Sequence, residues 1–216
     1  MPLIRSVFQD ELDGISQSLL KLTEMVSISI SKATLAMLKS DLKLAEEVIT
    51  DDVMIDEFQH EIDNRIIDII ARQQPVASDL RALVTALRMG SDLERMGDLA
   101  EHVAKIARRR HPECAAPAEL IATVTAMGDA AEKITKKTGT VISTRDTEMA
   151  LQVEKDDDVM DRLHRELIAI LIKPTWEHGI ESAIDLTLLG RYYERFADHA
   201  VSVSRRVYFL VTGKYA

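Results

Sequence analysis

Two pairs of acidic residues have the spacing needed to bind a cation together. Glu94 and Asp98 lie four residues apart, and so do Glu194 and Asp198. Residues four apart share one face of an α-helix, so each pair would project two carboxylates side by side. On an inward face such carboxylates repel each other and lose hydration, and a bound cation relieves both costs. We therefore expect a metal site at each pair, for a divalent or trivalent ion such as Mg, Mn, Fe or Zn.

Other roles for the acid pairs stay open. Arg95 and Arg195 lie beside the acids, so a salt-bridge network could replace the metal, and a solvated acidic face is a further alternative. His102 follows Asp98 by four residues and shares its face, which makes it a weaker candidate ligand. Its counterpart in the second pair is Ser202, so the two sites would differ.

Acidic residues in two other segments could complete a metal shell. They are Asp52, Asp56 and Glu61 in the first half of the chain and Asp157, Asp158, Asp161 and Glu166 in the second. Acidic residues on a helix more often form a solvated face than a binding site, so we expect that role for most of them.

Long amphipathic helices would have to position the acids. Apolar residues recur every three or four positions from Phe8 onward, and glycine and proline number only eight and five. Helix interiors tolerate neither residue well, so their scarcity permits long helices. The predicted helices span about 8–38, 42–74, 78–110, 117–142, 147–173 and 179–212, with a break near 50–52 in the second.

Apolar stripes lead into both acid pairs. In the third predicted helix, Leu80, Leu83 and Leu87 continue with helical steps to Glu94 and Asp98. In the sixth, the corresponding stripe consists of Ile180, Ile184 and Leu188. We therefore expect these apolar residues and the acids that follow them to face the interior.

The chain contains an internal duplication. Gly, Glu, Arg and Asp recur at a constant separation of 100 between segments 90–98 and 190–198, and the second and fifth helices match at a separation of 105. The prediction is an all-α fold of two tandem, similar three-helix bundles, with six long helices. The first repeat would span residues 1–112 and the second residues 113–216.

A di-iron or di-manganese carboxylate enzyme is the alternative function. Glu57 and His60 form a Glu-x-x-His, and Asp161 and His164 nearly repeat it. Di-iron bundles use this motif on two helices. Under the separation of 105, however, His60 aligns with Arg165, so the two groups are not equivalent.

Composition excludes several other classes. A net charge of −9 argues against nucleic-acid binding, which needs clustered Lys and Arg. The single cysteine, the lack of an apolar run long enough to span a membrane and the absence of a signal peptide favour a cytoplasmic protein. Motifs for a phosphate-binding loop or a catalytic nucleophile are also absent, so we expect a protein that is not an enzyme.

Four segments together resemble the PhoU family of phosphate-uptake regulators. They are residues 72–81 (RQQPVASDLR), 92–98 (DLERMGD), 192–200 (YYERFADHA) and 205–213 (RRVYFLVTG), and the form of the third is similar to the actinobacterial branch. The resemblance implies two similar three-helix bundles and maps the metal motif of the family onto Glu94 and Asp98 and onto Glu194 and Asp198.

The resemblance also implies a function and partners. It implies a negative regulator that represses phosphate uptake and the transcription of phosphate-starvation genes when phosphate is plentiful. The implied partners are the ATPase of a phosphate ABC transporter and a PhoR-type sensor histidine kinase, through which the protein would reach the membrane. A homodimer is a further expectation, although the sequence does not give the oligomeric state. A purely structural helical scaffold is the remaining alternative.

Overall fold

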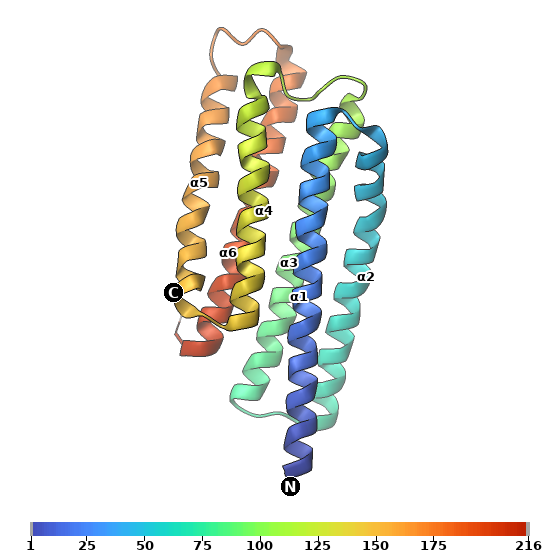
Figure 1. The fold of residues 1–216 in the computed structure, drawn as a ribbon, viewed down its shortest axis with the longest axis vertical. Helices are drawn as coiled ribbons and strands as arrows, with labels where there is room; N and C mark the ends of the chain where they lie inside the picture. Colours follow the sequence, from blue (N-terminus) through green and yellow to red (C-terminus); the bar gives the residue numbers. More distant parts are fainter. Residues whose placement is uncertain (1, 215–216) are drawn as a thin grey trace.

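The computed structural model describes residues 2–214, with side chains from residue 8 onward. These residues form six α-helices and one short 3-10 helix (Figure 1). The helices are α1 (Pro2–Lys39), α2 (Leu42–Gln73), α3 (Ser78–Arg110), η1 (Ala118–Leu120), α4 (Ile121–Thr144), α5 (Thr147–Leu171) and α6 (Gly179–Thr212). The prediction of an all-α fold with six long helices is confirmed.

Most predicted helix ends lie close to the observed ones, with two exceptions. Helix α1 begins at Pro2, six residues before the predicted start. Helix α2 is continuous, so the predicted break at 50–52 is wrong: the Thr50 hydroxyl donates to the Glu46 carbonyl at 2.8 Å and stays within the helix. Gly213 ends α6 as predicted, with a φ of 72° and its N–H bonded to the Phe209 carbonyl.

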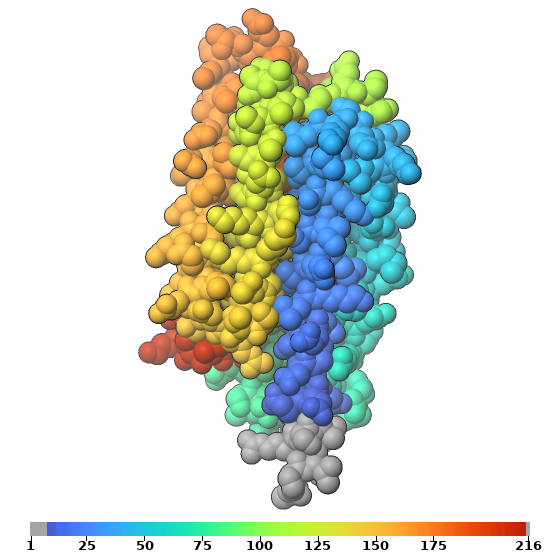
Figure 2. Space-filling model, viewed as in Figure 1, coloured from blue at the N-terminus to red at the C-terminus, as the bar shows by residue number. Residues whose placement is uncertain are grey.

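The six helices form two three-helix bundles that lie side by side (Figure 1). Helices α1, α2 and α3 pack against one another, as do α4, α5 and α6. The bundles meet where α1 contacts α4 and α3 contacts α6, and Figure 2 shows α1 alongside α4 on one face. Helices α3 and α6 run antiparallel, since Arg81 near the start of α3 reaches Phe209 near the end of α6.

One hydrophobic core runs through both bundles. Its largest fully buried side chains include Tyr193 and Phe196 of α6 and Leu19, Leu22 and Ile30 of α1. Aliphatic side chains make up most of the core, as the 4% aromatic content predicts. Among the described residues, no helix has both the length and the apolar character needed to span a bilayer.

The expected apolar stripe of the sixth helix lies on the surface instead. Ile180, Ile184 and Leu188 are exposed by 80%, 53% and 37%, so the prediction that they face the interior is wrong. The core side of α6 carries Leu186 and Leu189 instead, because α6 packs against α3, α4 and α5 together and its apolar sector is offset from the predicted stripe. In α3, Leu83 is buried as expected, whereas Leu80 is 38% exposed.

Polar contacts join the two bundles within the apolar interface. The hydroxyls of Thr34 in α1 and Tyr193 in α6 lie 2.6 Å apart and are both buried. Asp92 of α3 accepts from Arg206 of α6 at 2.7 Å and lies 3.1 Å from Nδ1 of His199. Because buried polar groups are costly unless paired, these contacts favour one register between the bundles.

Close packing of α1 on α4 depends on Gly128. A Cβ atom at this position would lie 2.4 Å from Cγ2 of Thr34 and 2.9 Å from its hydroxyl, which bonds Tyr193. We expect Gly128→Ala to destabilise the fold by about 1 to 2 kcal/mol, because overpacking outweighs the gain in helix propensity. Denaturant unfolding followed by circular dichroism measures this change.

Gly139, on the same helix, provides the matched control. Its Cβ would approach Thr23 Cγ2 at 3.5 Å, an ordinary contact. We expect Gly139→Ala to be neutral or to stabilise by about 0.5 to 1 kcal/mol through helix propensity. Equal effects from the two substitutions would show that the α1–α4 contact does not depend on Gly128.

Candidate functional site

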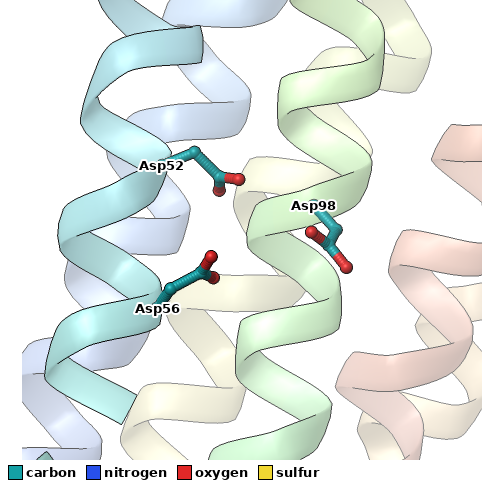
Figure 3. A group of neighbouring side chains, drawn as sticks. All are labelled: Asp52, Asp56 and Asp98. Atoms are coloured by element: carbon teal, nitrogen blue, oxygen red, sulfur yellow. The ribbon is translucent and has the colours of Figure 1, made fainter. Parts of the chain in front are cut away.

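Acidic side chains of α2 and α3 converge in the first bundle. Asp52 and Asp56 project from α2 toward α3, which carries Asp98 (Figure 3). One carboxylate oxygen from each of these three residues lies within 4.8 Å of the others. Two ligands on opposite sides of a cation are separated by about 4 to 5 Å at the bond lengths of Mg²⁺ and Ca²⁺. The three oxygens can therefore approach a single ion.

Glu94 and Glu101 extend this group along α3. Both side chains are half-buried, and their charges raise the pKa of Asp52. We call the five residues Asp52, Asp56, Glu94, Asp98 and Glu101 the first acidic cluster. Its members occur at helical spacing on two facing helices, so the helix pair itself brings them together.

A glycine lets α2 and α3 approach closely at this point. A Cβ atom on Gly97 would lie 3.1 Å from Oδ1 of Asp52 and 3.0 Å from Cγ2 of Ile55. Glycine inside a helix costs about 1 kcal/mol of helix stability relative to alanine. At Gly97 this cost accompanies the close contact between α2 and α3. The close contact helps to bury Asp52, which is only 7% exposed.

Burial is the main cause of the raised pKa values in the first acidic cluster. Burial, followed by the charges of Glu101, Asp56 and Asp98, raises the pKa of Asp52 from 3.8 to about 7. Burial also raises the pKa of Asp56 and of Glu94, with the charge of Asp98 as the next cause for both. Near neutral pH the Asp52 carboxyl is therefore partly protonated, and a cation beside it would favour the charged form.

Basic side chains neutralise only part of the first acidic cluster. Arg95 pairs with Asp98, and Lys105 pairs with Glu101. Oδ1 of Asp52 and Oδ1 of Asp56 are buried and have no hydrogen-bond partner among the described residues. An oxygen buried without a donor is costly, and a hard cation with oxygen ligands would satisfy both atoms. The donor set thus fits a divalent metal such as Mg²⁺ or Mn²⁺.

The second bundle repeats the arrangement on α5 and α6. Asp157 and Asp161 stand 105 residues after Asp52 and Asp56, and Glu194 and Asp198 stand 100 after Glu94 and Asp98. We call Asp157, Asp161, Glu194 and Asp198 the second acidic cluster. Burial, followed by the charges of the other three members, raises the pKa of Asp157 to about 7. Its Oδ1 is also buried without a partner among the described residues.

The two clusters differ in detail. Glu101 has Val201 as its counterpart, so the second cluster has one acid fewer. Asp198 is exposed, and Glu194 pairs with Arg191, where α3 carries Ser91. Among the described residues, only the first bundle brings three carboxylate oxygens within 4.8 Å. The first acidic cluster therefore fits a metal better than the second.

The structure places the four predicted acids in the two clusters and places His102 beside the first, with its Nδ1 3.7 Å from Oε2 of Glu101. The His102 ring meets the Tyr192 ring edge-on at 5.1 Å, across the interface between the bundles. Glu61 and Glu166 are exposed and lie outside the clusters, as a solvated face predicts. The di-iron alternative loses support, since Glu57 of its Glu-x-x-His is exposed and does not face the bundle interior.

Sequence reasoning undervalued two residues and missed a third. A solvated face is the role predicted for most acids of these segments, yet Asp52 and Asp157 have the most strongly raised pKa values of the clusters. Their exact recurrence at a separation of 105 was a signal that could have found them. Glu101 gave no such signal, because Val201 replaces it in the second repeat.

Comparison with known proteins supports the division of the chain into two similar three-helix bundles. The family model described as "PhoU domain" matches twice, at residues 19–107 and 124–207. The chain belongs to the PhoU family. Each match spans one three-helix bundle, so the duplication predicted from the sequence is confirmed.

Individual PhoU proteins match over almost the whole chain. The Mycobacterium tuberculosis "Phosphate-specific transport system accessory protein PhoU homolog 2" is 43% identical over 212 residues, which cover 98% of this chain and 100% of that protein. PhoU from Pseudomonas aeruginosa has a TM-score of 0.84 at 28% identity, covering 96% of this chain and all of that one. The "phosphate transport system regulatory protein PhoU" from Streptococcus pneumoniae has a TM-score of 0.87 at 26% identity, covering 97% and 99%. The higher identity to the mycobacterial protein supports the actinobacterial branch.

The raised pKa of Asp52 predicts how pH affects the metal-free PhoU chain. Between about pH 4 and 7, a carboxyl group whose pKa is raised by folding is protonated more often in the folded state than in the unfolded state. The free energy of unfolding therefore falls as the pH rises through that window. Asp52→Asn should therefore stabilise chelator-treated protein by about 1 to 3 kcal/mol at pH 8, with the gain shrinking toward pH 5. Urea unfolding at several pH values measures it.

Glu61→Gln is the control for this prediction, because Glu61 is an exposed acid on the same helix. We expect its stability to follow the wild type at every pH. If the free energies of unfolding of Asp52→Asn and wild type differed by the same amount at every pH, Asp52 would not be a buried, proton-binding carboxylate.

Proposed function

We propose that this PhoU protein is a non-enzymatic negative regulator of phosphate uptake and of the phosphate-starvation response. The printed names of its relatives, a phosphate-specific transport system accessory protein and a phosphate transport system regulatory protein, support this role. In the proposal the protein acts in the cytoplasm as an adaptor between the ATPase of a phosphate ABC transporter and a PhoR-type sensor histidine kinase. It reaches the membrane only through these partners.

The observation that carries the proposal is the occurrence of one acidic cluster in each bundle. Each cluster combines an aspartate whose Oδ1 is buried and has no partner among the described residues with an acid pair on the neighbouring helix. We propose that each cluster binds a metal ion, with Mg, Mn, Fe or Zn as the candidates. A bound ion would remove the repulsion between the carboxylates and hold α2 against α3 and α5 against α6.

The metal would act on regulation through the surface of the helix pairs. Glu94 and Asp98 are half-buried and Asp198 is exposed, so the clusters lie at the edge of the core. An ion at this edge changes both the local charge and the spacing of two helices that a partner can contact. We propose that this surface, with its ions, is what the transporter ATPase and the kinase recognise. A homodimer is a further part of the proposal, and the oligomeric state in solution tests it.

Removing the acid pairs in both bundles tests the role of the clusters in repression. The quadruple variant Glu94→Ala, Asp98→Ala, Glu194→Ala and Asp198→Ala would be expressed in a deletion strain that carries a reporter of the phosphate-starvation response. We expect the reporter to stay on in phosphate-rich medium, while circular dichroism shows an intact helical fold. The fold should persist because carboxylates at these positions are destabilising without a cation.

The double variant Glu61→Ala and Glu166→Ala is the matched control. These exposed acids are related by the same separation of 105 and lie outside both clusters. We expect this variant to repress fully. Full repression by the quadruple variant would overturn the proposed role of the clusters. A deletion strain whose reporter ignores phosphate altogether would favour a purely structural scaffold.

A further inference from the structure

Four arginines line a groove between α3 and α6. It lies where the start of α3 meets the end of α6 and has a volume of 250 Å³. The arginines are Arg81 and Arg88 of α3 and Arg205 and Arg206 of α6. A water molecule occupies about 30 Å³ of liquid, so the groove has room for a small anion with several waters. No acidic side chain lines the groove among the described residues.

Two of the four arginines are already paired. Arg206 donates from Nε to Asp92 at 2.7 Å, and Arg205 pairs with Glu154. Asp92 is 9% exposed and does not line the groove. The charges of Arg205 and Arg206 are therefore largely balanced by protein carboxylates.

The remaining donors in the groove are unpaired or held only by an aromatic ring. The Arg81 guanidinium lies over the Phe209 ring at 5.4 Å. Arg88 makes no ion pair or hydrogen bond with any described residue, and the same holds for the hydroxyls of Thr85 and Ser202. The groove thus offers two arginine charges and two hydroxyl groups, drawn from both bundles, to an acceptor that the protein does not supply.

The opposite end of the same helix pair provides an internal comparison. The separation of 100 places Asp185 at the position of Thr85. Asp185 is 5% exposed and accepts hydrogen bonds from both Arg109 and Arg110 of α3. Thr85 is equally buried, at 6%, but carries no charge. At one end of the α3–α6 interface Asp185 thus pairs with both arginines, whereas at the other end Asp92 pairs with Arg206 and no described carboxylate pairs with Arg81 or Arg88.

We propose that this arginine groove binds a phosphate-class dianion. Two uncompensated guanidinium groups balance two negative charges, and Arg is well suited to phosphate because its planar fork donates two parallel hydrogen bonds. Hydroxyls of Thr85 and Ser202 can donate to the remaining oxygens, which a simple carboxylate lacks. Free inorganic phosphate and the terminal phosphate of a nucleotide present the same chemistry. Because α3 and α6 belong to different bundles, the anion would bridge the two halves.

Calorimetric titration of the full chain tests the proposal. The protein is first treated with chelator and dialysed, so that phosphate cannot bind through a metal at the acidic clusters. Inorganic phosphate, ATP and sulfate are then titrated separately at low ionic strength, where interactions between exposed charges are least screened. We expect saturable binding of phosphate or ATP at one site per chain. Binding of inorganic phosphate would identify the free ion as the ligand, and binding of ATP would identify a nucleotide.

Two substitutions should weaken this binding in different ways. Arg88→Gln removes an unpaired donor and should reduce affinity roughly 10- to 100-fold, the loss expected for a charged hydrogen bond. Thr85→Asp places in the groove the carboxylate that Asp185 supplies at the other end, so it should abolish binding while the fold stays intact. Arg108→Gln is the control, because Arg108 is exposed on the same helix but does not line the groove.

Three results would overturn the proposal. The first is the absence of saturable heat up to about 10 mM of phosphate or ATP. The second is an equal loss of affinity in Arg88→Gln and Arg108→Gln. The third is that Thr85→Asp binds the anion as tightly as the wild type does. The inference does not depend on the proposed regulatory role, since it concerns the purified, metal-free chain. A failure to bind phosphate would leave the repression test of the acidic clusters unaffected.

Discussion

A carboxylate that is buried without a hydrogen-bond donor must either take up a proton or meet a cation. Asp52 is in this position between α2 and α3, and Asp157 is in it between α5 and α6. Burial and neighbouring acids raise the pKa of both groups to about 7, so neither protonation state is strongly favoured at neutral pH. A proton or a metal ion beside the aspartate would therefore stabilise the contact between the two helices of each pair.

This constraint connects the fold with its proposed use. A ligand that binds only the folded state stabilises it by mass action, so a metal at the first acidic cluster would tighten the contact of α2 with α3. Helix α3 also packs against α1 and α6, and thus lies at the junction of both bundles. A change at the cluster is consequently close to the interface that joins the two halves.

The duplicated fold has diverged at the positions that matter for binding. Val201 replaces Glu101 in the second acidic cluster, and Asp185 replaces Thr85 at the far end of the α3–α6 interface. Both differences change the charge at a site. The two halves therefore share one architecture but offer different chemistry, and the interface between them has one self-neutralised end and one arginine-rich end.

Helical periodicity and proline positions were enough to predict the six helices, because long amphipathic segments carry a strong signal. The recurrence of Glu94 and Asp98 at 194 and 198 similarly located both clusters. Periodicity failed at Ile180 and Ile184, because α6 contacts three other helices and the side that packs is set by tertiary contacts. It also could not show that Asp52 is buried, since this follows from the close approach of α2 to Gly97 of α3.

Metal content is the most direct test of the central claim that Asp52, Asp157 and their acidic neighbours bind a cation. Protein purified without a metal-affinity tag would be examined by elemental analysis, beside the variant Asp52→Asn with Asp98→Asn and the control Glu61→Gln. The account predicts bound metal in the wild type and the control, and loss of at least the share held by the first acidic cluster in the double variant. Folded wild-type protein without metal, whose stability does not rise when Mg²⁺, Mn²⁺, Fe²⁺ or Zn²⁺ is added, would contradict it.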